Sequence, residues 1–136
     1  MGAAVEQAAP KSGSILVLED EPVQRAVASD HLRGLGYTVF EAGTAVEAAE
    51  VLQAIDGVDL VFADINLPGV MGGLSFTVWM RERHPRIPII LTSGVRAVAP
   101  TLKGGQPLPF VAKPYDLDKL ATLIERMIAD ASPRER

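Results

Sequence analysis

The chain contains no cysteine and a single tryptophan among its 136 residues. Without cysteine it can form neither a disulfide framework nor a metal site built on thiolates, and its composition fits a reducing cytoplasm. No apolar run approaches the length of a membrane span, and residues 1–14 lack the basic and apolar regions of a secretory signal. Positive charge is not in excess either, because 13 Lys and Arg stand against 17 Asp and Glu, a formal net charge of −4. We therefore expect a cytoplasmic protein that has neither nucleic acid nor a membrane as its partner.

What is present is the composition of one globular domain. Apolar residues make up 48% of the chain and charged residues 22%, and the length suffices to bury a hydrophobic core. Small and polar residues predict a flexible N-terminal tail at 1–13 and a C-terminal tail at 131–136, on either side of a single domain at 14–130. Nothing after residue 130 resembles a DNA-binding or enzymatic output domain, so we expect no direct control of transcription by this chain.

Short apolar runs alternate with helix-like segments through this domain. Strands are predicted at 14–18, 37–40, 58–63, 87–91 and 108–112, and helices at 22–35, 45–55, 73–83 and from Asp116 to about 130. The nearly continuous apolar runs are typical of parallel strands that are covered on both faces. The predicted fold class is therefore α/β, with a single doubly wound, five-stranded parallel sheet. Residues 93–107 hold two prolines and three glycines, so we expect an irregular or shortened fourth helix there.

Four polar residues follow four of the apolar runs. Asp20 and Asp64 come after the first and third runs, and Thr92 and Lys113 come after the fourth and fifth. If the runs are parallel strands, all four side chains emerge at the same edge of the sheet, where open α/β folds bind ligands. Carboxylates, a hydroxyl and an ammonium group at one edge suit a divalent metal ion and a phosphoryl group.

Each of these residue types has a chemical role at such a site. A hard cation such as Mg²⁺ prefers oxygen ligands, which Asp20 in the acidic triplet at 19–21 and Asp64 could supply. A carboxylate can also act as a nucleophile and form an aspartyl phosphate, and the central position of Asp64 makes it the candidate. Lys113 would then hold a positive charge and Thr92 a hydroxyl donor near the phosphoryl oxygens.

These motifs resemble the receiver domains of response regulators in two-component signalling. The matching segments are ILVLEDEP (15–22), DLVFADINLPG (59–69), IPIILTSG (87–94) and PFVAKPYDLDKL (109–120). The resemblance implies a flavodoxin-like fold with strand order 2-1-3-4-5. It also implies that Asp64 accepts a phosphoryl group from a phosphohistidine on a histidine kinase or a histidine phosphotransfer protein.

The resemblance assigns roles to further residues. By resemblance, Glu19, Asp20, Asp64 and the backbone carbonyl of Asn66 would ligate Mg²⁺, with Glu19 acting directly or through water. Thr92 and Lys113 would bind the acyl phosphate, and the Lys113–Pro114 peptide bond would be cis.

A switch is also implied. Thr92 would move toward the phosphoryl group, and Phe110 would fill the vacated space. The surface formed by strand 4, residues 93–107, strand 5 and the last helix would then bind a downstream protein.

Two features of the third predicted helix bear on its start and on its packing. Gly72 stands where many receivers have an aspartate that caps the third helix, so a weaker start to that helix is expected. Val78 and Trp79 are interpreted as packing residues at the margin of this helix, with a partner-binding patch as the alternative.

Two competing functions stay open. One is a pseudo-receiver that binds partners without phosphorylation, against which the intact site residues argue. The other is an aspartyl-phosphate phosphatase, which usually carries a second aspartate where this chain has Asn66 and needs a substrate cap for which the chain has no spare length. We expect instead a phosphoacceptor that catalyses only its own phosphorylation and dephosphorylation, either as a stand-alone regulator or as the receiver of a hybrid kinase.

Overall fold

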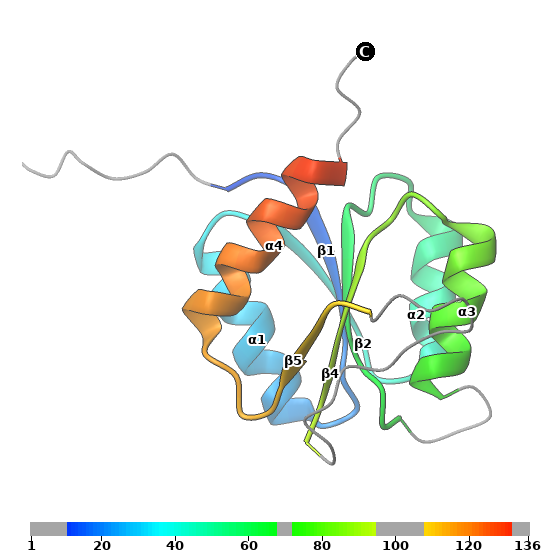
Figure 1. Cartoon of the computed structure of the whole chain (residues 1–136), viewed down its shortest axis with the longest axis horizontal. Helices are drawn as coiled ribbons and strands as arrows, with labels where there is room; N and C mark the ends of the chain where they lie inside the picture. Colours follow the sequence, from blue (N-terminus) through cyan, green and yellow to red (C-terminus); the bar gives the residue numbers. More distant parts are fainter. Residues whose placement is uncertain (1–10, 68–71, 95–107, 132–136) are drawn as a thin grey trace, which may run out of the picture.

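The computed structural model describes residues 11–67, 72–94 and 108–131, and it places a parallel sheet between two layers of helices (Figure 1). The elements are β1 Ser14–Leu18, α1 Pro22–Gly34, β2 Thr38–Ala42, α2 Ala45–Ala54, β3 Leu60–Asp64, α3 Gly73–Arg83, β4 Ile89–Ser93, β5 Phe110–Ala112 and α4 Leu117–Ala131. Five strands pair in the order β2-β1-β3-β4-β5, and every adjacent pair is parallel. The predicted fold class and strand order are confirmed.

Helices α1 and α4 cover one face of the sheet, and α2 and α3 cover the other (Figure 1). The strands explain both layers, because successive side chains of a strand point to opposite faces. In β1, Ile15 and Val17 join the core cluster under α1 and α4, whereas Leu16 and Leu18 join the cluster under α2 and α3. All residues of β3 and β4 are buried, as expected for central strands.

Helices α1, α2 and α4 each begin after a residue whose side chain accepts hydrogen bonds from backbone N–H groups of the first turn. The Glu21 carboxylate accepts hydrogen bonds from two backbone N–H groups in the first turn of α1, each at 3.0 Å. The Thr44 hydroxyl accepts one such bond at the start of α2, and the Asp116 carboxylate accepts two at the start of α4. At the start of α3, Gly72 supplies no side-chain hydrogen bond, as the sequence predicted.

The strand ends differ from the predicted ones. The fourth strand was expected to end at residue 91, but β4 continues through Thr92 and Ser93. The reason is backbone pairing: Thr92 lies opposite Asp64 in β3 and Val111 in β5, so the ladder extends past the apolar run into polar residues. The predicted irregular helix falls largely on residues 95–107, which lie outside the described residues.

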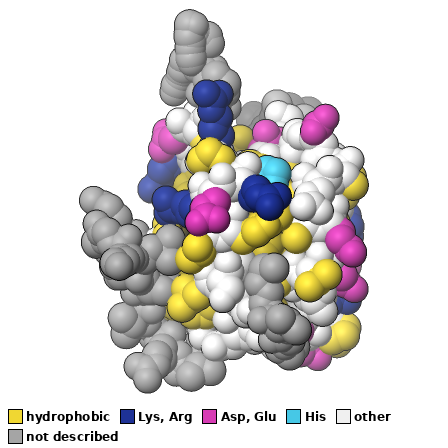
Figure 2. Space-filling view, turned by 90° about the vertical axis from the view of Figure 1, so that its right-hand side faces the viewer, with side chains coloured by type: hydrophobic (Ala, Val, Ile, Leu, Met, Phe, Trp, Pro, Cys, Tyr) yellow, Lys and Arg dark blue, Asp and Glu magenta, His cyan; other side chains and the backbone are white. Residues whose placement is uncertain are grey.

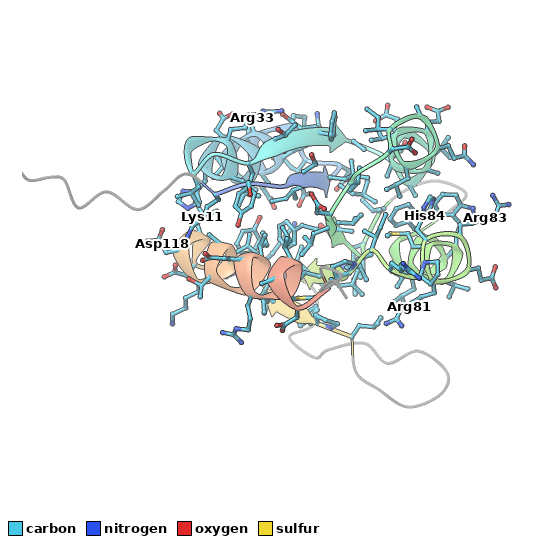
Figure 3. The ribbon with its side chains drawn as sticks, turned by 90° about the horizontal axis from the view of Figure 1, so that it is seen from above. Lys11, Arg33, Arg81, Arg83, His84 and Asp118 are labelled. Carbon is cyan, nitrogen blue, oxygen red and sulfur yellow. The ribbon has the colours of Figure 1, made fainter. Side chains whose placement is uncertain are left out.

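Trp79 belongs to the packing of α3. Its ring stacks on Phe76 at a centroid distance of 5.8 Å and also contacts His84 at 5.5 Å. The tryptophan packs against the buried core cluster, which confirms the packing interpretation, whereas Val78 is 44% exposed. Figure 2 shows the face over α2 and α3, where basic side chains lie beside a histidine, and Figure 3 places Arg83 and His84 at the end of α3.

Within the described ranges, no helix has both the length and the apolar composition needed to cross a membrane.

Candidate functional site

The polar residues predicted at the strand ends meet at the carboxyl edge of the sheet. Glu19 and Asp20 directly follow β1, and Asp64 is the last residue of the neighbouring strand β3. Thr92 pairs in register with Asp64, and Lys113 follows β5 on the far side of β4. Parallel pairing therefore gathers residues that are up to 94 positions apart in the chain.

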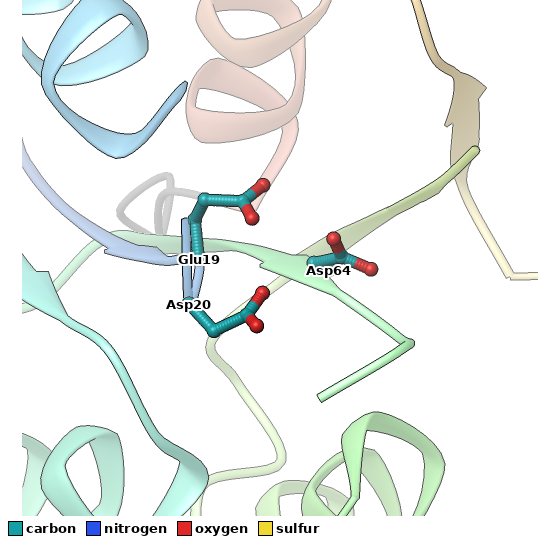
Figure 4. Close-up of side chains that lie close together, drawn as sticks. All are labelled: Glu19, Asp20 and Asp64. Carbon is teal, nitrogen blue, oxygen red and sulfur yellow. The ribbon is translucent and has the colours of Figure 1, made fainter. Parts of the chain in front are cut away.

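Three carboxylates form a cluster at this edge (Figure 4). Glu19, Asp20 and Asp64 each offer an oxygen that lies within 4.8 Å of the other two. Glu19 and Asp64 are buried, with 4% and 5% exposure, whereas Asp20 is exposed. The third acid of the triplet, Glu21, is not part of the cluster because its carboxylate caps α1.

Lys113 joins the two buried carboxylates. Its Nζ donates to Asp64 Oδ2 at 2.7 Å and to Glu19 Oε1 at 2.8 Å. Burial alone would lower the pKa of Lys113, but the hydrogen bonds to Asp64 and Glu19 and the charges of these two carboxylates together outweigh it and raise the pKa. The ammonium group is therefore a fixed positive charge beside Asp64 at neutral pH.

The electrostatics of the cluster favour a divalent cation. When ionised, the three carboxylates carry three negative charges, and Lys113 offsets one of them. Burial, opposed by the hydrogen bond from Lys113 and supported by the charge of Asp64, raises the pKa of Glu19. The repulsion between neighbouring carboxylates is relieved when one of them takes up a proton or when a cation binds. Oxygen ligands and excess negative charge fit Mg²⁺, and Glu19, Asp20 and Asp64 are the residues that could hold it.

Asp64 is held at both of its oxygens. While Lys113 binds Oδ2, the backbone N–H of Asn66 donates to Oδ1 at 2.8 Å. The neighbouring Thr92 is 1% exposed, and its Oγ1 has no hydrogen-bond partner in the described part of the chain. A buried hydroxyl without a partner costs free energy unless a ligand satisfies it. The site thus holds a fixed carboxylate, a fixed ammonium group and a buried hydroxyl that has no partner among the described residues.

Phe110 lies at the start of β5, half-buried and packed against the core cluster under α2 and α3. It is opposite Leu91 in β4, one position before Thr92. This places it beside the strand that carries the hydroxyl, while its role in a switch stays a prediction. The predicted cis peptide bond between Lys113 and Pro114 is confirmed.

Three residues that support the site were not identified from the sequence. Arg25 donates to the backbone carbonyl of Glu19 at 2.8 Å, which ties α1 to the acidic segment. Ser93 accepts a hydrogen bond from the Asn66 side chain. A Cβ atom on Gly73 would lie 2.3 Å from Ile65 Cα, so only glycine allows α3 to start this close to the end of β3. No motif marks these contacts, because each depends on a partner from another element.

An apolar groove lies next to Asp64. It is lined by Val23, Gln24, Val27, Lys113, Pro114, Tyr115 and Leu117. Val23 and Val27 are one turn apart on α1 and are 67% and 51% exposed. Because Lys113 lines the groove and also binds Asp64, the groove opens beside the carboxylate cluster.

Comparisons with known proteins agree with this arrangement. The family model described as response regulator receiver domain matches residues 15–125. The chain is 37% identical over 129 residues to the sensor kinase CckA of Brucella abortus, covering 91% of this chain and 14% of that protein. It is 33% identical over 124 residues to the DNA-binding transcriptional regulator NtrC of Escherichia coli K12, covering 86% of this chain and 25% of that protein. The chain thus spans about a quarter or less of the length of these relatives.

Solved structures show the same fold. The receiver domain of the hybrid histidine kinase CckA superposes with a TM-score of 0.71 at 30% identity, covering 85% of this chain and 99% of that one. A response regulator receiver protein from Sinorhizobium medicae gives a TM-score of 0.79 at 23% identity, covering 90% and 98%. At that lower identity the likeness concerns the fold alone.

Proposed function

Because the chain belongs to the response regulator receiver domain family, we propose that Asp64 accepts a phosphoryl group from a phosphohistidine. The donor would be a histidine kinase or a histidine phosphotransfer protein. One observation carries the proposal: the buried Asp64 carboxylate is fixed by Lys113 and by the Asn66 backbone, within a cluster of acids.

The transfer follows from these contacts. An oxygen of Asp64 attacks the phosphorus atom, the phosphorus–nitrogen bond breaks, and the imidazole of the donor leaves with its electron pair. Lys113 offsets charge on the phosphoryl oxygens, and the Thr92 hydroxyl donates to one of them. Bound Mg²⁺ would supply further neutralisation of charge on those oxygens, and Glu19, Asp20, Asp64 and the Asn66 carbonyl would hold it.

The switch rests on the vacant hydroxyl. In the unphosphorylated protein Thr92 Oγ1 is buried and has no partner within the described ranges, so an acyl phosphate on the paired residue Asp64 would give it an acceptor. Its movement would open space for Phe110 to turn inward. The surface over β4, β5 and α4 would change with it and recruit a downstream protein.

The donor would dock over α1. The apolar groove beside Lys113 offers Val23 and Val27 at helical spacing, with Pro114 and Tyr115 opposite. Exposed valines one turn apart fit the apolar stripe of a donor helix. A histidine on that helix would then face Asp64.

The setting of this reaction is also part of the proposal. The relatives include a sensor kinase and a transcriptional regulator that are several times longer than the chain. We propose that the chain acts in the cytoplasm as a stand-alone regulator or as the receiver part of a hybrid kinase, without an enzymatic activity beyond its own phosphorylation and dephosphorylation.

The test is incubation with acetyl phosphate and Mg²⁺, followed by intact mass measurement of the protein. We expect one added phosphate on the wild type and none on Asp64→Asn, which keeps the size of the side chain but removes the nucleophile. A persistent absence of adduct would favour a pseudo-receiver. Rapid multiple turnover of unrelated phosphomonoesters would favour an aspartyl-phosphate phosphatase.

A further inference from the structure

Asn66 makes two hydrogen bonds that connect the nucleophile to the end of β4. Its backbone N–H donates to Asp64 Oδ1 at 2.8 Å, and its side-chain Nδ2 donates to Ser93 Oγ at 2.5 Å. The second bond joins residues 27 positions apart and crosses from the loop after β3 to the last residue of the neighbouring strand. Ser93, Asn66 and Asp64 therefore form a continuous chain of contacts.

The two ends of the Asn66–Ser93 bond differ in how firmly the fold holds them. Ser93 is 1% exposed and pairs with Ala112 in β5. Its backbone carbonyl also accepts a hydrogen bond from the Lys113 N–H at 3.1 Å. Asn66, by contrast, is exposed and lies outside any helix or strand. A loop residue beside a reacting group needs an anchor on a rigid element to hold its geometry.

We infer that Ser93 is a positioning residue for phosphoryl transfer: it holds Asn66, and through the Asn66 backbone it sets the orientation of the Asp64 carboxylate. This inference rests on the proposed function of Asp64. Lys113 holds the other oxygen, Oδ2, so loss of the Ser93 contact leaves the carboxylate fixed on one side only. The Asp64 carboxylate then samples orientations in which Oδ1, released from the Asn66 N–H, no longer faces the phosphodonor. Phosphoryl transfer slows as a result.

The test compares Ser93→Ala with Ser29→Ala. Ser29 is also fully buried, but it lies in α1 and its Oγ has no hydrogen-bond partner within the described residues. Phosphorylation by acetyl phosphate at saturating Mg²⁺ should slow about fivefold in Ser93→Ala, the effect of losing one hydrogen bond, and stay unchanged in Ser29→Ala.

A double-mutant cycle with Asn66→Ala isolates the contact. If Ser93 acts through Asn66, Ser93→Ala should slow the reaction in the wild type and have no further effect in Asn66→Ala. Equal slowing in both backgrounds would overturn the inference, since Ser93 would then act by another route.

A spectroscopic measurement without any phosphodonor separates this inference from the proposed function. The proton resonance of the Asn66 backbone amide reports its hydrogen bond to Asp64 and should shift upfield in Ser93→Ala but not in Ser29→Ala. An unchanged resonance would overturn the positioning role even where the wild type is phosphorylated. If the resonance shifts in Ser93→Ala as expected but the wild type forms no adduct, the proposed function alone is overturned.

Discussion

Replacing Lys113 with methionine tests the electrostatics of the site most severely. The Lys113 ammonium is the only cation that makes a described ion pair with Glu19 or Asp64, and their side chains are only 6% and 7% exposed. Methionine retains much of the stem volume but removes the charge. The substitution therefore leaves two buried carboxylates facing each other without a counter-charge.

Breaking a buried ion pair by removing one partner costs about 3–5 kcal/mol. We expect the lower end, about 3 kcal/mol, at neutral pH without Mg²⁺, because the exposed Asp20 leaves the edge of the cluster open to water. The loss should shrink as the pH falls. The pKa of Glu19 is already raised in the folded protein and rises further without Lys113, so the folded state takes up a proton before the unfolded state does.

Bound Mg²⁺ should shrink the loss as well, because the cation binds only the folded state and supplies the counter-charge that the variant lacks. The assay is urea unfolding followed by the fluorescence of Trp79, the single tryptophan of the chain. Lys119→Met is the control, since Lys119 is exposed on α4 and its replacement should change stability by less than about 0.5 kcal/mol. A Lys113→Met variant as stable as this control, with the same response to pH and Mg²⁺, would refute the reasoning.

Three further predictions concern Gly73, Thr92 and the binding of Mg²⁺. Gly73→Ala should lower the free energy of unfolding by about 2 kcal/mol, because its Cβ would lie 2.3 Å from Ile65 Cα. Gly72→Ala, whose Cβ would lie 4.0 Å from the Leu67 carbonyl oxygen, is the control in the same urea titration. Thr92→Val should leave the unphosphorylated protein at least as stable as the wild type, because it removes a buried hydroxyl whose Oγ1 has no described partner. It should nevertheless slow adduct formation in a mass-spectrometric time course, and an unchanged rate would exclude a role for the hydroxyl. Mg²⁺ affinity, measured by calorimetry, should fall as the pH is lowered, because protons compete with the cation for the carboxylates. The fall should begin at a higher pH than for carboxyl groups of ordinary pKa, because burial raises the pKa of Glu19.

The sequence predicted the fold well because buried parallel strands leave a simple pattern. Each central strand must be apolar on both faces, and the polar residue that follows it must emerge at the common edge of the sheet. That is why Asp64, Thr92 and Lys113 could be placed together before any contact was known. An apolar run shows which residues are buried but not which residues pair in the sheet. The polar residues Thr92 and Ser93 pair as part of β4, so the predicted end of this strand was two residues too early.

The supporting contacts could not be predicted in the same way. Glu21 looked equivalent to Glu19 and Asp20 within the acidic triplet, but a helix start recruits it as a cap. Gly73 and Ser93 act through distances of a few ångströms to residues of other elements. Such distances depend on how α3 and β4 pack, which local sequence does not specify.

The most direct measurement of the central claim is to locate the phosphoryl group. An acyl phosphate is reduced by borohydride to an alcohol, so the modified aspartate becomes homoserine and can be identified by peptide mass spectrometry. After treatment with a phosphodonor and Mg²⁺, the predicted result is homoserine at position 64 and at no other aspartate. Unmodified Asp64 in a protein that carries phosphate, or reduction at Asp20 instead, would contradict it.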